Sequence, residues 1–483
     1  MPPGARASRS CGNCRAIKRR CDKQHPHCGQ CIRMREECSG YRDTWELFFH
    51  DQTSHTIERS KAIQVKSANS TRTAIPHPAY GLCPSPDEAG VNYFLHHFVI
   101  GGPSPSRGYL NYVPAVYSAD GHHPTLVASM AAVGLAALAS STQRPELVIH
   151  ARTKYREAIN NVNSALASPT ESVRDSTLMS VISLSLFEHV SDFKIWFRHV
   201  QGATALIVAR GKSQFSRPAS VLMFNQVRAD MAAACIHSLQ PFPKDMLELQ
   251  KEAAKQIGAS SAFWLLGVLA TRCTDLLSGV HYNKRSLEDF LEETVVLQRD
   301  FQHVMEIFTR EEPYTTNRKC NGAPEIIYEG RCDFYRTSWA IRIWNNSRML
   351  QIIVCEIMFH LLNKLLAKRP TQRTQIEMRL QETVEILSEL GDDILATVPQ
   401  ALGFVSSSKP DDISADFSST ECVSGGHMLT WCLYTVGKSP ATRSKTRKWI
   451  MKRLQDIGQN SGIAMALQFV DDIDEIDRLA GRV

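Results

Sequence analysis

The sequence of 483 residues predicts a mainly α-helical chain in three parts: a small two-zinc module of six cysteines and two short helices, a flexible linker, and a large all-α domain. Three observations lead to this prediction. Six of the fourteen cysteines fall within residues 11–38, residues 51–80 are polar, and the later sequence carries apolar residues at helical rather than alternating spacing. We expect the three parts to cover residues 7–43, 44–82 and 83–483.

The six clustered cysteines form an internal repeat. The pattern Cys-x2-Cys-x6-Cys begins at Cys11 and begins again at Cys28, seventeen residues later. Zinc takes four tetrahedral ligands, so six thiolates complete two zinc ions only if two of the thiolates are shared. The spacing therefore predicts a two-zinc cluster whose metal ligands are Cys11, Cys14, Cys21, Cys28, Cys31 and Cys38.

All of the net positive charge of the chain lies around this cluster. Residues 1–43 contain ten Lys and Arg against four Asp and Glu, whereas residues 44–483 contain 45 of each kind. A basic head on a neutral body is typical of a chain that binds a polyanion such as nucleic acid. The N-terminus has no apolar core like that of a signal peptide, so we expect the thiols in a reducing nucleus or cytosol, where they bind metal.

The residues between the cysteines extend the pattern. RAIKRR separates the second and third cysteines, and Pro26 stands two positions before the fourth. These features resemble the fungal Zn2Cys6 binuclear-cluster family. The resemblance implies a nuclear transcription factor of the RNA polymerase II type that binds double-stranded DNA at a CGG-like triplet. It also implies two zinc ions bridged by Cys11 and Cys28, with Cys14 and Cys21 completing one site and Cys31 and Cys38 the other.

The basic residues after the second cysteine are candidates for DNA contact. If residues 15–20 are helical, Arg15, Lys18 and Arg19 lie on one side at i, i+3 and i+4. Lys18 matches the family lysine that contacts guanine, whose N7 and O6 accept hydrogen bonds from a cation. Ile17 departs from the basic residue common in the family, which puts the preferred triplet in doubt. The expected DNA-binding residues are Arg15, Lys18, Arg19, Arg20 and Lys23, which would also suit a nuclear import signal.

Three alternative readings fit the residues less well. A mononuclear site that uses His25 or His27 would leave several thiolates without metal. An RNA-binding zinc knuckle would need an aromatic residue between the cysteines, and the sequence has none there. For an enzyme, the Gly-Lys-Ser triplets at 211–213 and 437–439 lack the upstream glycine of a P-loop, and no G-x-S-x-G or H-E-x-x-H pattern occurs. We expect no catalytic residues.

The linker has no dimerisation pattern. Residues 51–80 contain Ser and Thr throughout, with Pro76 and Pro78 near the end. A coiled coil needs apolar a and d positions over three or four heptads, and residues 44–82 do not have them. We therefore expect a monomer, or a dimer formed through the helical body.

The sequence after the linker predicts several helices. One begins at Pro145 and ends near residue 166, a second covers 341–365, and a third covers 376–390 and stops at Gly391. The apolar run 126–139 is shorter than the roughly twenty residues of a membrane span, so we expect a buried helix and no membrane partner. The basic stretch 443–453 has apolar neighbours at helical spacing, which favours a solvated helix face over a second import signal.

Residues 184–188 and 196–211 resemble the middle domain of fungal-specific transcription factors. The resemblance implies a regulatory domain that controls a metabolic gene set, including the secondary-metabolite kind, and that binds co-regulators or a small-molecule effector. A repressor or a scaffold would use the same zinc cluster. Helix packing around Trp196 also explains these segments, with Gly202 at a close crossing, Gly211 as a C-cap and His199 as a packing residue.

Overall fold

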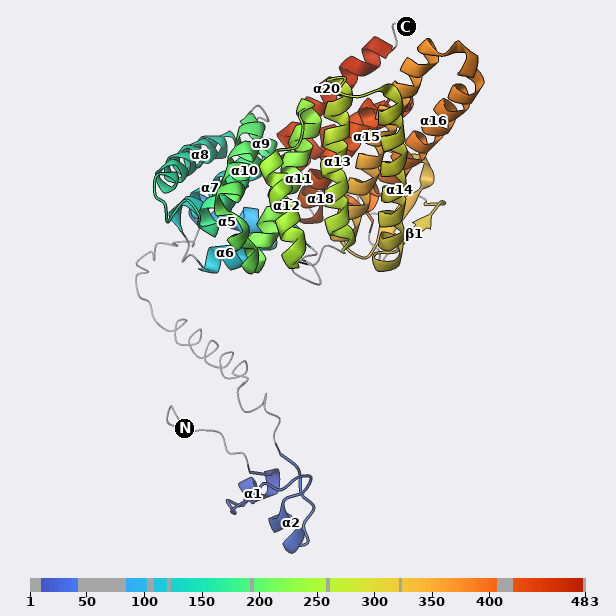
Figure 1. Ribbon diagram of the computed structural model, residues 1–483. Coiled ribbons are helices and arrows are strands. Elements are labelled where there is room, and N and C mark those ends of the chain that lie inside the picture. The colour runs from blue at the N-terminus through green and yellow to red at the C-terminus, as the bar shows by residue number, and fades with distance from the viewer. Residues whose placement is uncertain are drawn as a thin grey trace, which may run out of the picture. The chain divides into compact units, whose positions relative to one another are not determined.

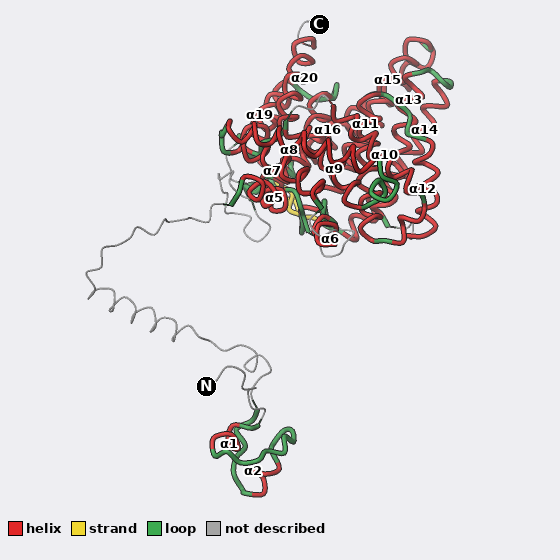
Figure 2. The backbone as a smooth tube through the Cα atoms, turned by 90° about the vertical axis from the view of Figure 1, so that its left-hand side faces the viewer, coloured by secondary structure: helices red, strands yellow, loops and turns green. Residues whose placement is uncertain are grey.

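A computed structural model of the chain describes residues 10–41, 84–101, 108–119, 123–191, 195–257, 261–320, 324–405 and 420–480. The chain divides into two compact units, Met1–Leu82 and Cys83–Val483. Helices make up nearly all of the regular structure in the described residues, which confirms the mainly α-helical fold class (Figure 2). The predicted linker and the predicted boundaries at 7, 43 and 83 lie outside the described residues. The prediction that the linker forms no coiled coil therefore stays a prediction.

The N-terminal unit is built around sulfur instead of apolar side chains. Its two short helices are α1 (Gly12–Ala16) and α2 (Gly29–Arg33). Each helix begins directly after the first cysteine of one half of the repeat. The core of the unit consists of Cys11, Cys14, Cys28 and Cys31, which have no exposed surface, with Cys21, Cys38 and Tyr41 packed against them. A unit this small gains its stability from bound metal and not from a hydrophobic core.

The C-terminal unit is a body of packed helices (Figure 1). Its elements in chain order are α5 (Pro86–His97), α6 (Val113–Ala119), α7 (Pro124–Ser141), α8 (Pro145–Leu166), α9 (Asp175–Val190), α10 (Trp196–Arg210), α11 (Pro218–Ser238), α12 (Lys244–Ile257), α13 (Ala262–His281), α14 (Leu287–Glu311), β1 (Tyr314–Asn317), β2 (Cys332–Tyr335), α15 (Ser338–Lys368), α16 (Arg373–Leu395), α17 (Val398–Ala401), α18 (Thr420–Lys438), α19 (Ser444–Asn460) and α20 (Ala464–Ala480). The two strands pair in antiparallel fashion, with Tyr314 opposite Tyr335.

Local sequence signals set several of the helix ends. The helix α8 begins at Pro145 and ends at Leu166, as the sequence predicts. Ser85 and Ser286 each form a capping box with a carboxylate three positions later, which starts α5 and α14. Gly211 follows α10 with a φ of 61°, a conformation that strains residues with a Cβ, so the predicted C-cap is confirmed.

Three helices, α7, α13 and α15, are long and apolar enough to cross a membrane by length and composition alone. In this structure all three pack against other helices of the body, with 72% of the apolar window buried in α7 and 56% in α13 and in α15. The helix α7 buries twelve of its eighteen residues, mainly against α5, α8 and α9. Gly134 of α7 lies so close to the backbone of Gly90 in α5 that a Cβ would clash there. The predicted buried helix at 126–139 is therefore confirmed.

Two glycines behave differently from the sequence prediction. The predicted end of α16 at Gly391 is wrong, because the helix continues to Leu395. Gly391 is buried and a Cβ there would lie 3.2 Å from the side chain of Val436, so this glycine serves packing instead of helix termination. The predicted close crossing at Gly202 is also wrong, since a Cβ there would lie at an ordinary 3.8 Å from Val181.

The predicted solvated basic face at 443–453 is confirmed for Lys445, Lys448 and Lys452, which are exposed, but is wrong for two arginines, which are buried. Arg447 is buried and donates to the carbonyl oxygens of Gly437 and Ser439, both at 3.0 Å. Arg453 is also buried, 2.8 Å from Asp456. A buried guanidinium can donate to the carbonyl groups at a helix end or pair with a carboxylate. The spacing of arginines in the sequence does not distinguish such a buried side chain from an exposed one.

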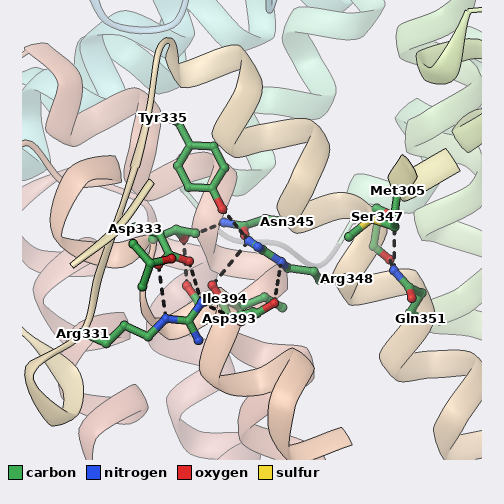
Figure 3. Close-up of polar contacts among 12 residues, drawn as sticks. Met305, Arg331, Asp333, Tyr335, Asn345, Ser347, Arg348, Gln351, Asp393 and Ile394 are labelled. Carbon is green, nitrogen blue, oxygen red and sulfur yellow. Dashed lines mark hydrogen bonds and ion pairs between the residues drawn. The ribbon is translucent and has the colours of Figure 1, made fainter. Parts of the chain in front are cut away.

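A buried ion network ties β2 to α15 and α16 (Figure 3). Arg331 lies 2.8 Å from Asp333 and 2.7 Å from Asp393. Arg348, fully buried on α15, lies 3.5 Å from Asp393 and donates to the hydroxyl of Tyr335 at 2.8 Å. Two guanidinium groups thus face two carboxylates, so the network holds the short sheet against two helices without an excess of buried charge.

Candidate zinc and DNA-binding site

Each half of the cysteine repeat turns back sharply after its short helix. In the first half, the N–H of Arg19 donates to the carbonyl of Cys14 at 2.8 Å, and the N–H of Lys18 donates to the carbonyl of Arg15 at 3.3 Å. This pair of bonds is a Schellman motif, and its turn residue, Lys18, has a φ of 51°. The reversal returns the chain so that Cys21 rejoins the other sulfur atoms.

The second half repeats the same turn. The N–H of Glu36 donates to the carbonyl of Cys31, and the N–H of Arg35 donates to the carbonyl of Ile32, both at 3.0 Å. Arg35 has a φ of 54° and stands seventeen residues after Lys18. The sequence repeat is therefore also a structural repeat, down to a left-handed residue that is not glycine.

The six cysteine sulfur atoms form two groups. One group contains Cys11, Cys14, Cys21 and Cys28, and the other contains Cys11, Cys31 and Cys38; within each group all sulfur atoms lie within 4.8 Å of one another. The distance between sulfur atoms is 3.8 Å for Cys11 and Cys31, 3.7 Å for Cys14 and Cys28, and 3.6 Å for Cys21 and Cys28. Cys11 thus belongs to both groups.

These distances fit zinc. Four sulfur atoms arranged tetrahedrally at about 2.3 Å from a zinc ion lie about 3.8 Å from one another. A disulfide would require about 2.05 Å, and all six cysteines are unpaired. Neither His25 nor His27 joins a group of metal-binding side chains among the described residues, which disfavours a mononuclear Cys/His site. The six cysteines therefore form a site for two zinc ions, as the sequence predicts.

The protein environment raises the pKa of some of the six thiols and lowers that of others. Burial raises the pKa of Cys11, and it raises the pKa of Cys31 to about 11. Zinc binds the thiolate, so metal and proton compete for the same sulfur atom. The N–H groups of Cys11 and Cys28 point at the sulfur atoms of Cys21 and Cys38, at 3.4 and 3.5 Å, and stabilise negative charge there.

An ion pair joins the two halves of the module. The Nη2 atom of Arg19 lies 2.6 Å from Oε2 of Glu36 and 3.8 Å from the sulfur of Cys31. The side chain of Arg19 is only 16% exposed. Much of this guanidinium is therefore turned into the module, although the sequence suggested a phosphate contact. The offset of seventeen residues would have placed Arg19 opposite Glu36, so the repeat did contain a signal for the pair.

The five predicted DNA-binding residues do not lie on one helix. The condition that residues 15–20 are helical is not met, because α1 ends at Ala16 and the chain then reverses to bring in the third cysteine. The side chains of Lys18, Arg20 and Lys23 are exposed, whereas that of Arg15 is half-buried and donates to the carbonyl of Ser10 at 3.3 Å. The module thus presents separate cations on consecutive turns.

Further polar contacts, which no pattern in the sequence predicts, close the module. Asp22 accepts a hydrogen bond from the N–H of Gly29 at 3.0 Å, which fixes the loop between the halves. Tyr41 donates to the carbonyl of Gln24 at 2.7 Å, and its ring lies 4.5 Å from that of His25. Tyr41 therefore packs against the module after the last cysteine.

In the body, His199 is a packing residue, as its position in an apolar helix predicts. Its Nε2 lies 2.8 Å from the hydroxyl of Tyr155, which also donates to Glu188 at 2.9 Å. Burial lowers the pKa of His199 to about 4, so the ring is neutral near neutral pH. Trp196, three residues earlier, is buried 5.7 Å from the ring of Trp431.

Two family models match the sequence. Residues 9–45 match the fungal Zn(2)-Cys(6) binuclear cluster domain, and residues 92–257 match the fungal specific transcription factor domain. The second match runs from within α5 to the end of α12. No curated protein and no solved structure matches the chain.

A six-cysteine zinc module followed by a helical domain of this kind defines a fungal transcription factor. The chain thus joins a Zn2Cys6 cluster domain at residues 9–45 to a fungal specific transcription factor domain at residues 92–257. It accordingly binds DNA, holds two zinc ions and regulates transcription, and the two matched domain families imply a nuclear location.

Proposed function

We propose that this chain is a sequence-specific regulator of genes transcribed by RNA polymerase II and that Lys18 reads a CGG-like triplet. The position of Lys18 carries the proposal. Its side chain is exposed on the first turn after α1, in a module whose shape two zinc ions fix. Guanine presents N7 and O6 in the major groove, where a held cation can donate to both.

The other exposed cations have a different role in this proposal. Arg20 and Lys23 contact phosphates, and Arg15 joins them at the end of α1. Phosphate contacts supply affinity and orientation but little sequence preference. Arg19 mainly holds the two halves together through Glu36, and it reaches DNA only when that ion pair opens.

For the metals, we propose that Cys11 and Cys28 bridge the two zinc ions. Cys14 and Cys21 then complete the first site, and Cys31 and Cys38 complete the second. The membership of Cys11 in both sulfur groups supports this arrangement. The short contact between the N–H of Cys28 and the sulfur of Cys38 supports the approach of Cys28 to the second site.

The proposed domains are residues 7–43 for DNA binding, 44–82 for the linker and 83–483 for regulation. The body would control a metabolic gene set in the nucleus, including the secondary-metabolite kind, in response to a co-regulator or a small-molecule effector, as a monomer or as a dimer through the body. The matched families are those of transcription factors, which favours this role over an enzyme with a zinc appendage. A repressor or scaffold would bind the same DNA.

Selection from random duplex DNA with the full, zinc-loaded chain tests the proposal. We expect enrichment of a CGG-like triplet, and a single triplet for a monomer or two at fixed spacing for a dimer. Binding without any enriched sequence would contradict the proposal. A reporter gene placed behind the selected site then separates the alternatives, since an activator raises its expression and a repressor lowers it.

A further inference from the structure

A cavity of about 170 Å³ lies inside the helical body, between α9, α11, α13, α15 and α18. Most of its wall is apolar, with aromatic surfaces from Trp196, Phe263 and Trp431. An apolar cavity of about 150 Å³ is known to hold a benzene molecule. The cavity is therefore large enough for one aromatic ring with a short substituent.

The wall also carries a connected set of polar groups. Gln226 donates to Asp230 at 2.8 Å and accepts from Arg342 at 3.4 Å, so these three side chains form a chain along the cavity. The guanidinium of Arg342 lies 4.6 Å from the centre of the Tyr109 ring and 5.6 Å from that of Trp339. Two aromatic rings and one amide thus fix the orientation of the Arg342 guanidinium, and none of these groups neutralises its positive charge.

The charges of the cavity wall do not balance. The wall contains two guanidinium groups, Arg342 and Arg228, but a single carboxylate, Asp230. Among the described residues no carboxylate lies within 4.0 Å of either guanidinium. Arg228 instead donates to the amide of Gln250 at 3.2 Å and lies over the ring of Trp264 at 4.3 Å. Burial of a cation without an anion is unfavourable for the folded chain. One bound negative charge would therefore balance the excess guanidinium group of the wall.

A second polar group at the cavity has unused hydrogen-bonding capacity. His427 is 9% exposed, and its Nε2 lies 2.9 Å from the hydroxyl of Tyr109. Its Nδ1 has no hydrogen-bond partner within the described residues, and neither has Oδ1 of Asn225. Both residues line the cavity. A buried polar atom normally has a partner, so these atoms indicate that a polar ligand completes the site.

We propose that this cavity binds a small molecule that combines one aromatic or similarly apolar ring with a single carboxylate, and that the carboxylate pairs with Arg342. A guanidinium matches a carboxylate through two parallel hydrogen bonds, and the apolar wall covers the ring. The negative charge of the ligand offsets the excess guanidinium, which a neutral or cationic molecule does not do. The proposal rests on the proposed function only where it treats this ligand as the effector of the regulator.

Calorimetric titration of the full, zinc-loaded chain tests the ligand class. The probes are 3-phenylpropionate, its neutral amide 3-phenylpropionamide and the cation 3-phenylpropylamine. We expect the carboxylate to bind at least about tenfold more tightly than the amide, and the cation to bind most weakly. Equal affinities for carboxylate and amide, or no binding of the carboxylate at about 10 mM, would overturn the proposal.

Three variants connect the binding to the cavity. Arg342→Gln should abolish the preference for the carboxylate over the amide, while Arg152→Gln, an exposed arginine on α8, should leave it unchanged. Ala233→Leu, which fills part of the cavity without a change of charge, should weaken both probes by about tenfold or more. If Arg342→Gln does not fold, Ala233→Leu decides, and unchanged binding by that variant overturns the proposal.

A DNA-binding assay on the same preparation separates the two proposals. A chain that binds its selected duplex but none of the probes refutes the ligand site alone. A chain that binds 3-phenylpropionate through Arg342 but no DNA sequence specifically refutes the DNA proposal alone. A change of at least about threefold in DNA affinity or reporter output on addition of 3-phenylpropionate would assign the ligand class as effector.

Discussion

Arg19 and Glu36 stand at equivalent positions of the two half-sites, seventeen residues apart, and form an ion pair of 2.6 Å. Each follows the left-handed turn residue of its half, Lys18 or Arg35, and each donates its N–H back to a cysteine carbonyl. The backbone repeat is therefore nearly symmetric while the charges are not. This asymmetry turns two equivalent positions into an attractive contact and leaves the first half as the basic one.

The substitution Glu36→Gln should release Arg19 toward DNA. In the parent chain the ion pair occupies this guanidinium, so its release adds about one phosphate contact and raises the salt dependence of DNA binding by about 0.9 in log Kd against log salt. The measurement is a series of duplex titrations at increasing salt. Glu37→Gln makes the same charge change beside the ion pair and should alter the slope much less. Equal slopes for the two variants would show that the pair does not restrain Arg19.

Lys18→Ala should remove sequence preference. The loss of one base contact should cost about 1–3 kcal/mol at the selected site and far less on unrelated duplex DNA. Arg35→Ala is the matched control, because Arg35 has the same backbone conformation in the second half and is also exposed. Competition binding with specific and unrelated duplexes measures both variants. An equal loss on all duplexes for Lys18→Ala would make Lys18 a phosphate contact.

The zinc site could be predicted almost completely from the sequence, and the DNA-facing surface only in part. Cysteine spacing and the tetrahedral preference of zinc restrict the cluster to a few arrangements. The grouping of Arg15, Lys18 and Arg19 on one side depended on a helix from Arg15 to Arg20, which does not form because the return of Cys21 requires a turn at Lys18. Positive φ at a lysine carries no local sequence signal.

The body shows a similar division. Proline and polar caps predicted α8 from Pro145 to Leu166 because these signals are local. The roles of Gly391, Arg447 and Arg348 depend on residues far away in the sequence that pack beside them. A single sequence does not contain that information. For the same reason the sequence does not predict the cavity or the excess of guanidinium groups over carboxylates in its wall.

Cys11→Ala should remove both zinc ions. Its sulfur belongs to both sulfur groups, so its loss leaves each site with an incomplete ligand set. Zinc per chain, measured by metal analysis on purified full chain, should fall from about two to well below one. Cys235→Ala changes a buried cysteine of the body outside the cluster and should keep the full amount. Retention of one firmly bound zinc by Cys11→Ala would contradict sharing through this residue.

Arg348→Ala should strongly destabilise the body. The substitution leaves Asp393 with a single guanidinium and the buried Tyr335 hydroxyl without its donor, which should lower the free energy of unfolding by about 3–5 kcal/mol. Urea unfolding followed by tryptophan fluorescence measures this, since six of the seven tryptophans lie in the body. The exposed Arg336→Ala should change stability by less than about 0.5 kcal/mol. Comparable midpoints for the two variants would show that the network is not stabilising.

Glu356→Gln should stabilise the body at alkaline pH but much less at acid pH. Burial raises the pKa of Glu356 to about 7, the positive charge of Lys438 opposes the shift, and one carboxyl oxygen has no hydrogen-bond partner among the described residues. An unfolded glutamate has a pKa of about 4.3. Between these two pKa values the folded chain binds more protons at this site than the unfolded chain does. The stability that Glu356 provides is therefore complete below about pH 4 and is lost as the pH rises through about 7.

The neutral amide removes this loss. We expect the variant to be more stable than the parent by about 1–3 kcal/mol near pH 8, with less than half of that gain near pH 5. His360 and Lys438 line the same surface pocket and are present in both chains, so the substitution at Glu356 is the only change of sequence between the chains. Urea unfolding at the two pH values provides the measurement, with the exposed Glu382→Gln as a control that should show no such difference. A gain of the same size at both pH values would mean that the folded and unfolded chains bind protons equally at this site, so that burial does not raise the pKa of Glu356.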